Sequence, residues 1–222
     1  MNSKMIIVTL LSALAVVSHA APQTGSMTDS RDGKKYKTVK IGNQTWMAEN
    51  LNYRIMDSWC YDDHQQNCTK YGRLYTRKSV SQVCPNGWHL PDSLEFITLI
   101  NELGLRVSKH VIKKDTVDLI EDVGNYLKST TGWNNNGNGS DLAGFSAIPG
   151  GNLIPNTYRF YGLGDYAHFW TSDYIYVQET HKTPLLDMTF SMNKVTHYGG
   201  FFKEKIGGGY SVRCVKDDKK GE

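Results

Sequence analysis

The four cysteines constrain the fold of this 222-residue chain most strongly, because the chain begins with a sequence typical of export. An even number of cysteines in an exported protein predicts disulfides, which persist in oxidising compartments. Cys60, Cys68, Cys84 and Cys214 allow three pairings. We favour Cys60–Cys68, which closes a small polar loop. The second disulfide is then Cys84–Cys214, which joins the early part of the domain to its last strand and stabilises it by about 4–5 kcal/mol in the chain-entropy model.

The first 20 residues predict a secretory signal peptide. Lys4 supplies a positive charge, and an apolar run over Met5–Val17 follows it. Ser18 and Ala20 then place small residues at −3 and −1 of a cleavage site after Ala20. The run is too short to span a bilayer, which needs about 20 apolar residues, and a buried N-terminal helix would not explain the small residues after it. We expect a protein that is secreted, periplasmic or on the outer cell surface, with no membrane span after cleavage.

The remaining length of roughly 200 residues fits one domain with a sizeable core. We expect a polar linker over 21–32, a single domain over 33–216 and a disordered tail over 217–222. The formal charge is +3, and basic and acidic residues are interspersed, so nucleic acid is not an expected partner. The chain has 13 tyrosines and 21 glycines, which favour strands joined by tight turns over a helical bundle.

Periodicity indicates a hairpin followed by two helices. Apolar and polar residues alternate over Lys35–Met47 around a central Gly-Asn pair, which predicts two strands with a tight turn. Asp92 and Glu95 predict a capping box at the start of a helix that ends at Gly104. A second helix is predicted over Thr116–Lys128, where apolar residues recur at helical spacing.

The C-terminal half has no helical period and predicts strands. The segments with strand character are Phe169–Ser172, Tyr174–Val177, Leu185–Phe190 and Tyr210–Val215. A hairpin, then two helices, then a loop-rich series of antiparallel strands predicts an α+β fold rather than alternating α/β units.

Eight short blocks that occur in order carry a resemblance to a known family. They are YKTVKIG at 36–42, TWMAENL at 45–51, YGRLY at 71–75, CPNGWHLP at 84–91, LKS at 127–129, GFSAIPGG at 144–151, FWTS at 169–172 and SVRCV at 211–215. Over roughly residues 28–217 the chain resembles the Fibrobacter succinogenes major paralogous domain family, a group of exported bacterial proteins. The resemblance implies a fold akin to the C-type-lectin-like domain and the formylglycine-generating enzymes, and it supports the Cys84–Cys214 pairing. For function it implies only surface association, with adhesion or polysaccharide handling as hypotheses.

Signals for catalysis are weak, and no catalytic residue is assigned. The oxidase chemistry of formylglycine-generating enzymes needs two reactive cysteines near the C-terminal strands, whereas only Cys214 lies in that half. The sequence contains neither G-x-S-x-G nor H-E-x-x-H. Asp165, Asp173 and Glu179 are candidates for a glycosidase pair, but their sequence spacing does not give their separation in space.

The loop over Trp133–Asp141 is the best candidate for a metal. Calcium accepts six to eight oxygen ligands in irregular geometry. The loop offers side-chain oxygens at Asn134, Asn136, Asn138 and Asp141. The alternative is a turn-rich surface loop, because Asn and Gly are the usual turn residues. Zinc bound by the cysteines is a weaker hypothesis, since the chain has no C-x-x-C pair.

An aromatic surface is the second candidate site. Exposed aromatic rings stack on the C–H faces of sugars. The candidate residues are Tyr158, Phe160, Tyr161, Tyr166 and Trp133. The alternative is packing in the core or in turns, which we expect for Trp46, Trp88 and Trp170.

The sequence as a whole indicates an exported, non-catalytic binding module. Its partner is expected to be a polysaccharide, a cell-envelope component or another surface protein, and calcium is the favoured cofactor candidate. Two alternatives stay open, namely a carbohydrate-active enzyme and a purely structural, disulfide-stabilised envelope protein.

Overall fold

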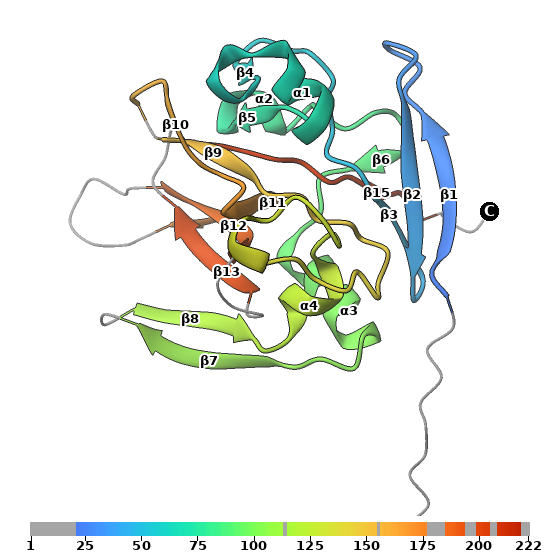
Figure 1. Ribbon diagram of the computed structural model, residues 1–222, viewed down its shortest axis with the longest axis vertical. Helices are drawn as coiled ribbons and strands as arrows, with labels where there is room; N and C mark the ends of the chain where they lie inside the picture. Colours follow the sequence, from blue (N-terminus) through green and yellow to red (C-terminus); the bar gives the residue numbers. More distant parts are fainter. Residues whose placement is uncertain are drawn as a thin grey trace, which may run out of the picture.

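The structure, a computed structural model, describes residues 21–112, 115–154, 156–176, 185–193, 199–204 and 208–218 (Figure 1). The signal peptide predicted over residues 1–20 lies outside these ranges, as do residues 219–222 of the predicted tail. In the described ranges, no helix has both the length and the apolar character needed to cross a membrane.

A five-stranded antiparallel sheet brings the two ends of the domain together. Its strands are β1 (Gln23–Thr28), β2 (Lys35–Ile41), β3 (Gln44–Met47), β15 (Val215–Lys216) and β6 (Trp88–His89), in that spatial order. The predicted hairpin is therefore confirmed as β2 and β3, with Gly42 at a positive φ of 58° in the turn. Figure 1 shows β1 and β2 side by side with the short β15 near them.

Half of the segment expected as a linker, residues 21–32, is an edge strand, β1 (Gln23–Thr28). β1 pairs with β2 along its whole length, from Gln23 opposite Lys40 to Thr28 opposite Lys35. The side chains of β1 are almost all exposed, so the strand has no apolar alternation that could reveal it. Backbone hydrogen bonds to β2 hold it in place, and these leave no trace in the side-chain pattern.

A ten-stranded, mostly antiparallel sheet forms the rest of the fold. Its spatial order is β4-β5-β14-β9-β11-β12-β13-β8-β7, and β10 pairs with β9 off this path. β9 and β11 pair in parallel. The strands are β4 (Ser58–Trp59), β5 (Leu74–Thr76), β7 (Val107–Ile112), β8 (Asp115–Ile120), β9 (Gly150–Ile154), β10 (Arg159–Leu163), β11 (Tyr166–Tyr176), β12 (Leu185–Asn193), β13 (Gly199–Glu204) and β14 (Gly209–Tyr210).

The helices are short and lie between the strands in sequence. They are α1 (Gln65–Tyr71), α2 (Arg77–Val80), α3 (Ser93–Glu102) and α4 (Val123–Leu127), with 3-10 turns η1 (Tyr61–Asp63) and η2 (Asn134–Asn136). The predicted capping box opens α3, because Asp92 accepts from the Glu95 amide and Glu95 accepts from the Asp92 amide. Together with the two sheets, these helices make the fold α+β, as the sequence predicts.

The second predicted helix, Thr116–Lys128, is wrong in its first half. Residues 115–120 form β8, which pairs with β7 as a hairpin, and only Val123–Leu127 is helical. Thr116 and Val117 are β-branched and favour strands. Asp122 then takes a left-handed conformation that breaks the strand before α4 begins.

Two clusters of buried side chains form the core. In the first, the Trp46 ring lies 4.8 Å from Phe96 of α3 and 5.8 Å from Phe145, measured between centroids. In the second, the Trp170 indole packs on Tyr210 and donates to the Tyr75 carbonyl. Trp46 and Trp170 are thus core residues, as expected.

The disulfides pair as favoured from the sequence, Cys60 with Cys68 and Cys84 with Cys214. Cys214 is fully buried in the second cluster, and Cys84 packs against that cluster. The bond therefore joins the segment after α2 to the residue directly before β15, an inner strand of the five-stranded sheet.

Candidate functional site

Exposed tyrosines gather around β10, on the hairpin that it makes with β9. Tyr158, just before the strand, is 77% exposed, and Tyr161 within it is 56% exposed. Phe160, between them, is half-buried and packs on Tyr61 of the disulfide loop at a centroid distance of 5.2 Å. The alternation of the strand therefore turns one aromatic ring toward the protein and leaves its neighbour exposed to solvent.

A continuous row of rings connects this surface to the core. Tyr161 stacks on Tyr166, and Tyr166 stacks on His168, with centroids 5.8 Å and 5.7 Å apart. His168 contacts Tyr210, which packs on the buried Trp170. Burial lowers the pKa of His168 to about 4, so the imidazole is neutral at ordinary pH and behaves as part of the aromatic row. The exposed end of the row is thus held by packed rings rather than by a free loop.

A pocket of about 390 Å³ opens beside Tyr158. The Tyr158 ring packs edge-on against Trp59 of β4 at 6.1 Å, and both residues line the pocket. Leu153 adds apolar surface, while Asp57 and Asn156 are among the polar lining residues. An apolar wall with a few polar groups is the usual chemistry of a sugar site.

Trp133, expected on the aromatic surface, lies in the core instead. It is 5% exposed, and its indole Nε1 donates to the Ala147 carbonyl. The Lys128 ammonium lies 4.9 Å from the ring centroid. The polar neighbours of Trp133 in the sequence suggest a surface residue, but the loop folds back and buries the ring.

Three of the four side chains proposed for calcium accept or donate hydrogen bonds within the protein. Asn134 donates to Asp165, and Asn138 accepts from the Trp133 amide. Both oxygens of Asp141 accept from Ser146. Burial raises the pKa of Asp141, although these hydrogen bonds lower it. Asn136 lies exposed at the end of η2. Calcium at this loop stays a prediction.

The carboxylates considered for hydrolysis lie on different elements. Asp165 accepts from Asn134, and Asp173 accepts from the Ser93 amide at the start of α3. Glu179 lies outside the described residues. Over the ranges that the structure describes, no three His, Cys, Asp or Glu side chains gather in a way that would hold a metal ion.

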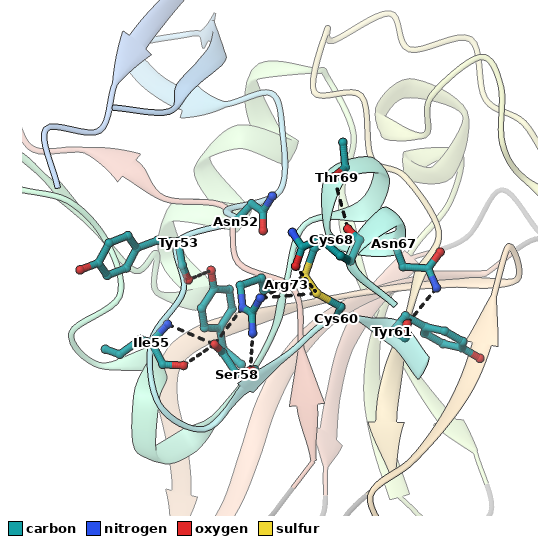
Figure 2. Close-up of a disulfide and its surroundings, with 12 residues drawn as sticks. Asn52, Tyr53, Ile55, Ser58, Cys60, Tyr61, Asn67, Cys68, Thr69 and Arg73 are labelled. Carbon is teal, nitrogen blue, oxygen red and sulfur yellow. Dashed lines mark hydrogen bonds between the residues drawn. A yellow bond between two sulfur atoms is a disulfide. The ribbon is translucent and has the colours of Figure 1, made fainter. Parts of the chain in front are cut away.

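Sequence reasoning missed the residue that anchors the Cys60–Cys68 disulfide. Arg73 is buried, and its guanidinium donates to both sulfur atoms and to the Ser58 carbonyl (Figure 2). It also donates through Nε to the Ser58 hydroxyl. Burial lowers the pKa of Arg73. The charged residue in the YGRLY block was the signal, since an arginine directly before the buried strand β5 needs a buried partner.

Comparison with known proteins identifies a family. A family model described as the Fibrobacter succinogenes major domain matches residues 39–216. The matched range includes both disulfides and the whole aromatic row. No curated protein and no solved structure matches the chain.

Proposed function

The chain belongs to the Fibrobacter succinogenes major domain family, and we propose that it is an exported, non-catalytic module that binds polysaccharide on the aromatic face beside β10. One observation carries the proposal. Two tyrosines of one hairpin are more than half exposed and rest on packed rings: Tyr158 lines the pocket and packs on Trp59, and Tyr161 stacks on Tyr166. Large exposed apolar groups in a small region mark interaction sites.

The arrangement suits a sugar chain better than a flat apolar partner. Sugar rings present C–H faces that stack on aromatic rings and hydroxyls that need hydrogen-bond partners. Tyr158 and Trp59 offer the rings, while Asp57, Asn156 and Thr157 offer side-chain oxygens within the same pocket. Because the rings are already packed, little conformational entropy is lost when a ligand binds.

We also propose that the fold is C-type-lectin-like and that the protein functions outside the cytoplasm. In support of the first point, a disulfide links the segment after α2 to the last strand, and the first and last strands share one sheet. In support of the second, both pairs of cysteines are oxidised, which is typical of exported proteins.

The test is a polysaccharide pull-down and a glycan array on the protein with both disulfides intact. We expect the double variant Tyr158→Ala/Tyr161→Ala to bind about tenfold or more weakly, since each aromatic contact contributes roughly 0.5–1.5 kcal/mol. The matched control is Leu94→Ala, which removes a 67% exposed apolar side chain on α3, outside the pocket.

Three outcomes decide the proposal. Equal loss in the tyrosine and leucine variants, with unchanged melting temperatures, would place binding elsewhere. Binding to no polysaccharide would refute the proposed ligand class. A calcium chelator added in a parallel arm tests the Asn134–Asp141 loop, because binding through calcium would disappear with the ion.

A further inference from the structure

A second cavity, of about 370 Å³, lies between the five-stranded sheet and α1. The lining side chains include five cationic residues and one carboxylate, Glu49. The cationic residues are Lys34, Lys35, Lys37, Lys70 and Arg213. No residue lines both this cavity and the pocket beside Tyr158. The excess of positive charge makes this cavity a different kind of site from the aromatic face.

Arg213 is fully buried and has only neutral hydrogen-bond partners. Its guanidinium donates to the Asn50 side-chain oxygen and to the carbonyls of Met47, Phe145 and Ser146. An arginine has five N–H donors, so one N–H on Nη2 has no acceptor among the described residues. Burial lowers the pKa of Arg213 to about 9, which reflects the cost of holding this charge away from water.

The nearest carboxylates do not pair directly with Arg213. Asp141 raises the pKa of Arg213 through its charge, but its oxygens accept from Ser146. Glu49 acts in the same direction at a distance, while one of its oxygens accepts from the Lys37 amide. A buried cation without a hydrogen-bonded anion is costly, and an anion in the cavity would remove that cost.

The lysines leave positive charge available at the cavity. Lys35 and Lys37 are exposed on β2 and form no ion pair with any residue that the structure describes. Lys70 on α1 lies over the Tyr71 ring. Lys34 is the exception, because its ammonium pairs with Asp32 and donates to the Asn52 carbonyl.

We propose that this cavity binds the carboxylate of a sugar acid, with Arg213 beneath it and Lys35, Lys37 and Lys70 around it. The volume corresponds to about a dozen water molecules, and a hexuronate has about as many non-hydrogen atoms. The cavity is therefore larger than a free phosphate or sulfate requires. Glu49 and Asn52 are within the lining as partners for sugar hydroxyls. The proposal goes beyond the aromatic face and does not depend on it.

The experiment is calorimetric titration of the oxidised protein with galacturonate, galactose and inorganic phosphate at low ionic strength. We expect binding of galacturonate, weaker binding of phosphate and none of galactose, and we expect added salt to weaken the galacturonate complex. The variant Lys35→Gln/Lys37→Gln should weaken galacturonate binding about five- to tenfold. The control Lys40→Gln/Lys216→Gln removes the same charge from exposed residues of the same sheet, outside the cavity.

Four results would overturn the proposal. These are equal binding of galactose, equal or tighter binding of phosphate, equal weakening in the two double variants, and no heat with galacturonate. The exposed lysines do not contribute to the core, so both variants should keep the melting temperature of the parent protein. The Tyr158→Ala/Tyr161→Ala variant should bind galacturonate as tightly as the parent protein does. A failure of the basic cavity to bind galacturonate can therefore be told apart from a failure of the aromatic face to bind polysaccharide.

Discussion

The two disulfides should differ strongly in how much they stabilise the fold. Cys84–Cys214 closes a loop with a sequence separation of 130, whereas Cys60–Cys68 spans only 8. In the chain-entropy model these lengths correspond to about 5 and about 2.5 kcal/mol at 25 °C. Cys214 is also fully buried, so a serine there would place a hydroxyl in an apolar cluster and add to the loss. We expect Cys84→Ser/Cys214→Ser to be less stable than Cys60→Ser/Cys68→Ser by at least about 2 kcal/mol.

The assay is equilibrium unfolding in urea, followed by tryptophan fluorescence, for the parent and the two double variants. Removal of the long cross-link should also raise the slope m, because the unfolded chain then exposes more surface. In the Cys60→Ser/Cys68→Ser variant, Arg73 loses its contacts with both sulfur atoms, so this variant loses more stability than loop length alone predicts. The extra loss narrows the difference in stability between the two double variants but does not reverse it. A Cys60→Ser/Cys68→Ser variant that is as unstable as the other would refute the loop-length argument.

Three further variants test individual side chains. Arg213→Met leaves four buried oxygens without a donor and should cost more than about 4 kcal/mol, measured by denaturant unfolding; a loss below about 1 kcal/mol would contradict this. Burial lowers the pKa of His168 to about 4, so the folded state should lose up to about 3 kcal/mol as pH falls from 6.5 to 4. His168→Gln should remove that dependence from a stability-against-pH series, and an unchanged slope would contradict it. Partial burial lowers the pKa of His89, but hydrogen bonds to Asp217 and Glu95 raise it above its usual range. The stability that His89 adds should therefore decline as pH rises through its raised pKa. The measurement is the free energy of unfolding of the parent and of His89→Gln over pH 6–8. A difference between the two proteins that stays constant with pH would contradict the prediction.

Local signals in the sequence predicted the elements that depend on local contacts. The Gly-Asn turn of the β2–β3 hairpin and the capping box at Asp92 are set by neighbouring residues, and both are confirmed. The elements that the sequence did not predict depend on pairing with strands that are not visible in the local pattern. β1 is polar and exists because β2 offers it a hydrogen-bonding edge, and β8 replaces a helix because β7 and β13 flank it.

The candidate sites show the same division. The Tyr158–Tyr166 stretch could be proposed because its closely spaced aromatic residues and glycines are visible in the sequence. Trp59, which completes the pocket beside Tyr158, lies about a hundred positions away and gave no such signal. The basic cavity combines Lys35 with Arg213 from the opposite end of the chain, so only the fold brings these charges together.

The short disulfide loop connects the two candidate sites. Trp59, just before Cys60, forms a wall of the pocket beside Tyr158, while Cys68 and Lys70 line the basic cavity. Arg73 holds both sulfurs and the Ser58 carbonyl, so the two walls are fixed to one buried guanidinium (Figure 2). A cross-link that closes a short loop adds less to global stability than one that closes a long loop. Its position argues that it serves mainly to keep the two cavity walls in place, whereas Cys84–Cys214 holds the fold itself together.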